Sequence, residues 1–326
     1  MTDIDAHARN RDSWSRYWAA QPAHSLPGSF DDGYAGSIAA FWKDVSAELP
    51  PQAAVLDLAT GNGPVPRLLM RLRPDLQIDA VDAADVAPQW ASDGRSMPRF
   101  HPRVRCEALP FPEATFDLIS SQYGIEYAEL SSSLAEVARV LRDGGTFAAV
   151  VHSRDSRIVT VAAEELAHAN ALLLPGAALD AITALVPFMA LAGKQDTQRA
   201  LNANPCAGVA RDRFNQSMDL VRFAASRSST PDLLRELLQW APQLLAFTRT
   251  TGQVDAALQA CDRYREQLED AVERYRALLV AARSLGEMQQ LVEDLRAVGI
   301  QQSGIANLLH DGHTLGWSLR ACRQHR

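Results

Sequence analysis

The sequence predicts a doubly wound α/β domain, in which helices cover both faces of a mostly parallel sheet. Three observations predict it. Short apolar runs alternate with helical patterns over residues 51–152. One of these runs, Ala54–Leu58, leads directly into a turn that contains Gly61 and Gly63. About twenty residues after that turn, a second apolar run ends at Asp82. Alternation of this kind requires right-handed crossovers and places ligands at the carboxyl ends of the strands.

The composition sets broad limits on fold and function. With 326 residues, 47% of them hydrophobic, the chain can bury a core large enough for one large domain or two. The formal net charge of -7 provides no basic field that would attract nucleic acid. The longest apolar stretch, 171–191, is interrupted by prolines and an aspartate, so no membrane span is expected. The N-terminal residues are polar and charged, unlike a signal peptide.

The cysteines favour a reduced, cytoplasmic protein without a metal site. They are scattered along the chain, with neither a C-x-x-C pair nor a histidine spacing typical of zinc. We therefore expect free thiols and a cytoplasmic location. The four residues are Cys106, Cys206, Cys261 and Cys322.

Residues 1–50 predict a helical cap rich in aromatic side chains. A loop is expected at 24–33 and a second amphipathic helix at 38–49, stopped by two prolines. Core packing of the two helices is the simpler interpretation. The alternative is a lid whose aromatic side chains cover a bound cofactor or substrate. Three aromatic residues fall on one face of the first helix: Trp14, Tyr17 and Trp18.

Five strands and three helices are expected in the α/β part. The strands are Ala54–Leu58, Gln77–Asp82, 104–107, Phe116–Gln122 and 146–152. The helices are 65–73, 85–93 and 131–141. Ser131 fits the N-cap of the last helix, and the pair Gly144-Gly145 fits its C-terminal stop.

The strand rhythm stops after residue 152, which predicts a helical insertion over 153–285. Helical patterns occur at 158–173, 231–247 and 254–284. From 286 onward the sheet is expected to resume with a helix at 287–297, a turn at Gly299, and strands near 300–309 and 314–321. The pair Asp311-Gly312 between those strands is typical of a hairpin. The expected α/β domain therefore comprises 51–152 and 286–326.

The glycine turn permits a sharp bend and a close approach to a ligand, beside the N–H groups of a following helix. An ordinary strand-to-helix turn is the competing interpretation. A dinucleotide fingerprint would need a third glycine where the chain has Pro66, which disfavours a nicotinamide-dependent oxidoreductase. Asp82 suits the two hydroxyls of a ribose. Its rival, Asp79, would point to the opposite face of the sheet.

Four stretches, taken in order, resemble class I S-adenosylmethionine-dependent methyltransferases, particularly the small-molecule branch related to ubiquinone and menaquinone C-methyltransferases. They are VLDLATGNG (55–63), IDAVDAAD (78–85), EALPFPEATFDLISS (107–121) and LAEVARVLRDGGTFAAVV (134–151). Residues 287–323 resemble the last helix and closing antiparallel strand pair of that fold. The resemblance implies a Rossmann-like sheet with an antiparallel last strand, and S-adenosyl-L-methionine as the cofactor.

The resemblance also implies which residues bind that cofactor. The acid of the first strand and the glycine turn would hold its amino-acid end: Asp57, Ala59, Gly61, Asn62 and Gly63. Asp82 would bind the ribose, and Gln122 would lie at the end of the fourth strand. Cys106 and Glu107 are the remaining candidates for the contact to the adenine, because Arg105 stands where relatives usually have an aspartate.

The end of the fourth strand faces the transferable methyl group in this family, so its side chains are candidates for the acceptor site. Gly124 would allow a close backbone approach, and Tyr127 would add an aromatic wall. The competing interpretation is a strand end with packed tyrosines. His152, at the end of the fifth strand, could act as a general base, although a lone histidine is more often packed. The candidate catalytic residues are Tyr123, Glu126 and His152.

The expected function is methyl transfer to a small-molecule acceptor by in-line displacement at the sulfonium. Proximity and alignment would supply most of the rate, and a base is needed only if the acceptor must lose a proton. The insertion 153–285 would enclose the substrate or form a homodimer contact. The alternatives are a cofactor-binding regulatory protein without turnover and a protein methyltransferase. Neither nucleic acid nor a membrane is expected as a partner.

Overall fold

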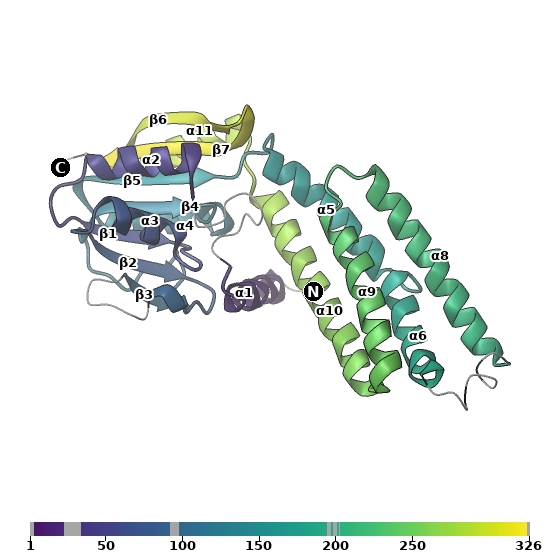
Figure 1. Cartoon of the computed structure of the whole chain (residues 1–326). Helices are drawn as coiled ribbons and strands as arrows, with labels where there is room; N and C mark the ends of the chain where they lie inside the picture. The colour runs from purple at the N-terminus through teal and green to yellow at the C-terminus, as the bar shows by residue number, and fades with distance from the viewer. Residues whose placement is uncertain are drawn as a thin grey trace. The chain divides into compact units, whose positions relative to one another are not determined.

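The computed structural model describes residues 3–22, 34–91, 98–193, 197, 201 and 203–324. The chain divides into two compact units, Met1–Thr160 together with Ala277–Arg326, and Val161–Arg276. The predicted loop at 24–33 lies outside the described residues. The first unit contains the sheet and the second is helical (Figure 1).

The sheet of the first unit has seven strands in the order β3-β2-β1-β4-β5-β7-β6 (Figure 1). The first five strands of that order pair in parallel, whereas β7 is antiparallel to both of its neighbours. This arrangement confirms the predicted doubly wound α/β sheet with an antiparallel closing strand. The strands are β1 (Ala54–Leu58), β2 (Gln77–Asp82), β3 (Arg99–Pro102), β4 (Phe116–Gln122), β5 (Leu141–Val151), β6 (Ile300–His310) and β7 (His313–Arg323).

Helices cover both faces of this sheet because successive side chains of a strand point to opposite faces. In β1, Val55 packs in a core cluster with residues of α2 and α3, whereas Leu56 and Leu58 pack with residues of α4 and α11. The helices of this unit are α1 (Asp3–Ala19), α2 (Gly36–Ala47), α3 (Pro64–Leu72), α4 (Leu130–Val140) and α11 (Leu285–Ala297). Short 3-10 helices are η1 (Gln89–Ala91) and η2 (Ile125–Tyr127).

The third strand was predicted wrongly at 104–107, and the structure places it at Arg99–Pro102. This strand is the edge of the sheet and its side chains are largely exposed, so it lacks the apolar run that marks a buried strand. Polar contacts hold it instead. The guanidinium of Arg99 donates to the Asp79 carboxylate, and His101 lies 2.7 Å from the same carboxylate.

The predicted helix at 85–93 is also wrong. Residues 85–88 are not helical, only the short η1 follows, and residues 92 and 93 lie outside the described part. Pro88 lacks a backbone N–H group and disfavours helix at the residue before it, which explains the extended path.

The capping of α4 differs from the prediction at both ends. The N-cap is Glu129 rather than Ser131, and its carboxylate accepts the N–H groups of Ser131 and Ser132 at 3.1 and 2.8 Å. The helix ends at Val140 and β5 begins at the next residue, so Gly144 lies inside the strand, at φ 78°. The glycine pair is therefore not the helix stop.

The second unit is built from helices around one apolar cluster, and the ring of Trp240 stacks on that of Tyr264 at 4.3 Å. The predicted helical segments are confirmed to within a few residues. The helices in or bordering this unit are α5 (Arg157–Leu173), α6 (Ala178–Ala192), α8 (Pro205–Arg227), α9 (Asp232–Thr251) and α10 (Val254–Ala281). Among the described helices none could span a membrane by itself, although α5 and α6, bent by 41° at their junction, pass the length and composition test as a pair.

Candidate functional site

The turn after β1 holds three residues in the left-handed region. Gly61 has φ 54° and Gly63 has φ 74°, which glycine adopts without penalty. Ala59 has φ 51°, which costs roughly 1 kcal/mol or more for a residue with a Cβ. Strain of this kind persists where the surroundings over-determine a functional loop.

Asp82 ties the end of β2 to this turn. Its Oδ2 accepts the N–H of Gly61 and its Oδ1 accepts the N–H of Ala84, each at 2.7 Å. Burial raises the pKa of Asp82 to about 6, although both backbone hydrogen bonds lower it. Asp79, the rival acid, is bound to Arg99 and His101 instead.

Asp57 lies beneath the turn rather than at its surface. It is buried, and Ser120 Oγ donates to its Oδ1 at 2.6 Å. Burial raises the pKa of Asp57 to about 7, against the effect of that hydrogen bond. The hydrogen bond from Ser120 links β4 to β1, and the role of Asp57 in cofactor binding stays a prediction.

A cavity of about 1070 Å³ opens at the carboxyl ends of β1, β2 and β4, within the first unit. Several predicted site residues line it: Ala59, Asp82, Cys106, Glu107, Gln122 and Tyr123. Other predicted residues are not among its described lining: Asp57, Gly61, Asn62, Gly63, Glu126 and His152. The structure thus gathers half of the predicted residues at one cavity and places the others behind its wall or in the turn.

Besides Asn10 Oδ1 of α1, two buried polar groups at the ends of β1 and β4 lack a hydrogen-bond partner among the described residues that line this cavity. They are Thr60 Oγ1 and Gln122 Nε2. The other amide atom of Gln122, Oε1, accepts the indole N–H of Trp42, which fixes the side chain. Because an unsatisfied buried polar group costs about 1–3 kcal/mol, a polar ligand that bonded both groups would be stabilised here.

The loop after β3 forms another wall. The carboxylate of Glu107 accepts from the Arg105 guanidinium and from the Glu129 N–H. Burial alone would raise the pKa of Glu107, but these hydrogen bonds together lower it, so the carboxylate is ionised. Burial raises the pKa of the Cys106 thiol to about 12, which keeps it neutral. This wall therefore offers one fixed acceptor beside an uncharged thiol.

Aromatic side chains of α1 complete the cavity. Trp14 and Trp18 line it, with ring centroids 5.7 Å apart in a stacked arrangement. Trp18 also packs with Ala84 and Val86, as the core interpretation of this helix expects, whereas the lid interpretation stays a prediction. A Cβ at Gly61 would lie 2.5 Å from the Trp18 ring, which shows how closely the indole covers the turn.

The candidate acceptor side contains two of the predicted catalytic residues, and both are buried. The ring of His152 stacks on Tyr123 with centroids 4.3 Å apart, and its backbone N–H donates to Glu126 Oε1 at 2.8 Å. Burial lowers the pKa of His152 to about 3 and raises that of Glu126 to about 7. Their catalytic roles stay predictions, and a histidine with this pKa is a weak base.

The lining residues that sequence reasoning missed include Tyr34, Thr60 and Pro64. Thr60 and Pro64 flank the glycines, so their place in the turn was a usable signal. Tyr34 lies far from the turn in the sequence, and nothing local in the sequence indicates that it lines the cavity.

The chain resembles known proteins over the region that builds this cavity. Residues 56–149 match a family described as methyltransferase domain. A ubiquinone/menaquinone biosynthesis C-methyltransferase of Geobacter sulfurreducens is 35% identical over 98 residues, which are 28% of this chain and 38% of that protein. The Teredinibacter turnerae protein of the same name is 27% identical over 208 residues, which are 59% of this chain and 83% of that protein.

Among solved structures, the chain is similar to the Burkholderia thailandensis 1,6-didemethyltoxoflavin-N1-methyltransferase. The sequence identity is 12% and the TM-score is 0.43, and the match covers 89% of this chain and 79% of that one. The chain spans only 38% of the length of the Geobacter relative and 48% of a Thermus thermophilus demethylmenaquinone methyltransferase.

Proposed function

We propose that the protein transfers a methyl group from S-adenosyl-L-methionine to a small-molecule acceptor, because residues 56–149 match a methyltransferase-domain family. The observation that carries the proposal is the cavity of about 1070 Å³ at the carboxyl ends of β1, β2 and β4. This is where ligands bind in doubly wound sheets.

The residues of the cavity fit the cofactor's chemical groups. Asp82 at the end of β2 supplies a carboxylate for the ribose hydroxyls. The unpartnered Thr60 Oγ1 and Gln122 Nε2 supply hydrogen-bonding groups for the amino-acid end. Asp57, buried behind the turn, places a negative charge near the cofactor's ammonium and sulfonium. Cys106 and Glu107 would flank the adenine.

The acceptor would enter on the side of Tyr123, Gly124 and Tyr127, which line the same cavity. When bound, S-adenosyl-L-methionine supplies an activated methyl group whose sulfur is already a good leaving group. The chain would then contribute alignment of the acceptor with that methyl group and exclusion of water by the α1 indoles. The buried Tyr123 hydroxyl donates to the backbone carbonyl of Leu315, so the ring orientation is fixed.

No ionisable base is assigned to the transfer. His152 and Glu126 do not belong to the described lining, and the pKa of His152 is lowered to about 3. An acceptor that is already nucleophilic, or that ionises in water, fits this arrangement best. The transfer would then depend on the alignment of the acceptor atom with the methyl group, and not on a proton relay.

The test is methyl transfer from labelled cofactor to the components of a metabolite extract. Wild-type protein is expected to label at least one small molecule, and Asp82→Asn is expected to reduce labelling because it removes the ribose acceptor charge. Exposed Asp262→Asn is the matched control and should label as wild type does. Cofactor binding without any labelling would favour a regulatory protein. Labelling confined to proteins would overturn the small-molecule proposal.

A further inference from the structure

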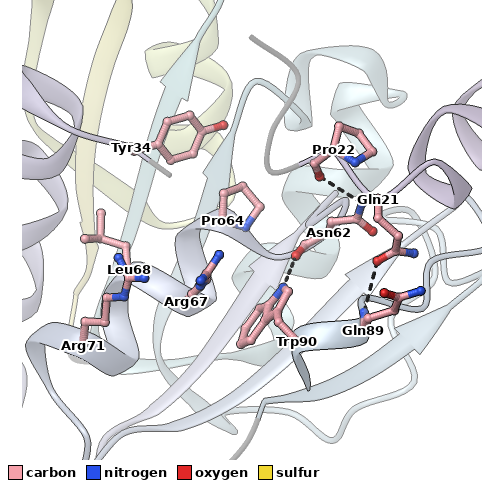
Figure 2. A pocket seen from close by; sticks show the side chains of 10 residues that line it. All are labelled: Gln21, Pro22, Tyr34, Asn62, Pro64, Arg67, Leu68, Arg71, Gln89 and Trp90. Atoms are coloured by element: carbon pink, nitrogen blue, oxygen red, sulfur yellow. Dashed lines mark hydrogen bonds between the residues drawn. The ribbon is translucent and has the colours of Figure 1, made fainter. Parts of the chain in front are cut away.

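A second cavity, of about 240 Å³, lies beside α3 (Figure 2). Its walls come from the first turns of that helix, from the chain after α1 and from η1. Trp90 is held in place because its indole N–H donates to the Asn62 carbonyl at 2.7 Å. The Gln89 N–H donates to Gln21 Oε1 at 3.1 Å, which joins the two neighbouring segments. These hydrogen bonds are drawn in Figure 2.

Two arginines of α3 line this cavity, and neither has an acidic partner among the described residues. Arg67 and Arg71 are one helical turn apart, so their positive charges repel each other. Arg67 lies over the Trp90 ring, 5.9 Å from its centroid. The next arginine of the chain, Arg73, is by contrast bound to Asp75 at 2.8 Å.

Two guanidinium groups that have no acidic partner among the described residues lie at one cavity, and this arrangement favours an anion. Each guanidinium presents a fork of N–H donors that matches the oxygens of a carboxylate or phosphate. The apolar surface of Leu68 and the ring of Trp90 would contact an organic body attached to that anion (Figure 2). The cavity volume of about 240 Å³ suits a small molecule.

A third group points to a ligand independently. Asn62 is 4% exposed and its Oδ1 has no partner among the described residues, whereas its Nδ2 donates to the carbonyls of Trp18 and Pro22. A hydroxyl or amine of the ligand would satisfy Oδ1. Asn62 lines this cavity and not the larger one.

We propose that this cavity is a second ligand site, which binds a small organic oxyanion through Arg67 and Arg71. Tyr34 and Pro64 line both cavities, so the anion would lie next to the cofactor site without occupying it. The proposal does not rest on methyltransferase activity, because it follows from charges and space that the first cavity does not use.

The test is calorimetric binding to the full chain of benzoate and phenyl phosphate, with neutral benzamide as the comparison. Binding of at least one anion and none of benzamide is expected, with and without saturating S-adenosylhomocysteine. The double variant Arg67→Gln/Arg71→Gln should weaken anion binding roughly tenfold or more, since each lost charge-assisted hydrogen bond accounts for about that factor. The preferred anion separates a carboxylate site from a phosphate site.

Matched controls keep the result unambiguous. Arg213→Gln/Arg235→Gln removes two exposed helix arginines and should leave anion binding unchanged. The single variant Arg71→Gln alters an exposed side chain and should retain the fold while weakening binding. Failure of both anions to bind wild-type protein overturns the proposal. So does binding that survives loss of both cavity arginines, or that S-adenosylhomocysteine abolishes by competition.

Discussion

A Cβ atom at Gly124 would lie 2.5 Å from the Cβ of Ala59, far inside their van der Waals contact distance. The two residues follow neighbouring strands, β1 and β4, and both line the large cavity. Ala59 is held at φ 51° and Tyr123 at φ 53°, so left-handed residues lie on both sides of this contact. The close packing of these two segments therefore requires a residue without a side chain at Gly124.

Gly124→Ala is expected to destabilise the protein by ~1–3 kcal/mol, the usual cost of overpacking. The expected cause is the clash between the new Cβ and the Cβ of Ala59. Thermal unfolding of the full chain measures it. The control is Gly208→Ala in α8, where a Cβ would meet nothing within 4 Å, and stability should be equal or higher. Equal stability of both variants would contradict the clash.

The buried Asp57 makes stability depend on pH. Its pKa is raised to about 7 in the folded chain, above the ordinary value of 3.8, so between these values the folded chain binds more protons than the unfolded one. The stability contributed by protonated Asp57 is therefore lost as pH rises through about 7. Relative to wild type, Asp57→Asn should gain ~1–3 kcal/mol more at about pH 8 than at about pH 5, because the loss in wild type begins above pH 3.8 and is complete only above about pH 7.

The measurement for Asp57 is the melting temperature of both proteins across that range without ligand. Asp262→Asn, a change at an exposed aspartate, should shift nothing at either pH. A gain of equal size at both pH values would mean that ionisation of Asp57 is not its cause.

Trp18 covers the glycine turn, and we expect that removal of its indole weakens cofactor binding while the fold is retained. The indole lines the cavity and lies within 3 Å of the position that a Cβ would take at Gly61. Trp18→Ala is expected to weaken S-adenosylhomocysteine binding roughly tenfold, since an aromatic contact is worth about that much. Phe223→Ala removes an exposed aromatic from α8 and should leave binding unchanged. Unchanged affinity in Trp18→Ala would place the indole outside the site.

Glu126 has a structural role in this arrangement. Its Oε1 accepts the His152 N–H at 2.8 Å, and a glutamine oxygen can accept the same bond. Glu126→Gln should therefore retain turnover. Glu126→Ala should lose about 1–3 kcal/mol of stability because a buried N–H loses its partner. If Glu126→Gln kept cofactor affinity but lost turnover by orders of magnitude, Glu126 would be a catalytic base.

The strands and the turn that build the site could be predicted because their signals are local. β1 and β4 are largely buried, and each contains a short apolar run that indicates a strand. The acid that ends β2 follows the glycine turn at a typical spacing. The hairpin between β6 and β7 was likewise predicted from Asp311 and Gly312, which adopt φ 48° and 77°. Edge strand β3 was misplaced because polar contacts to Asp79, rather than apolar burial, hold it.

The depth of each side chain could not be predicted in the same way. Strand alternation indicates the face to which Asp57 or His152 points, but it does not indicate whether other side chains cover that residue. Both are buried outside the described lining of the cavity. The contacts of Trp18 and Tyr34 join segments far apart in sequence, so they depend on the packing of the whole unit.

The central claim is that the cavity at the ends of β1, β2 and β4 binds the cofactor. Calorimetric titration of the full chain with S-adenosylhomocysteine tests it most directly. The account predicts saturable one-to-one binding, lost or strongly weakened in Asp82→Ala, and retained in Asp262→Ala. It also predicts proton release on binding of the cationic methyl donor at about pH 6.5, because the donor's charge favours ionised Asp57 and Asp82. Absence of binding by the wild-type chain, or equal affinity in Asp82→Ala, would contradict the account.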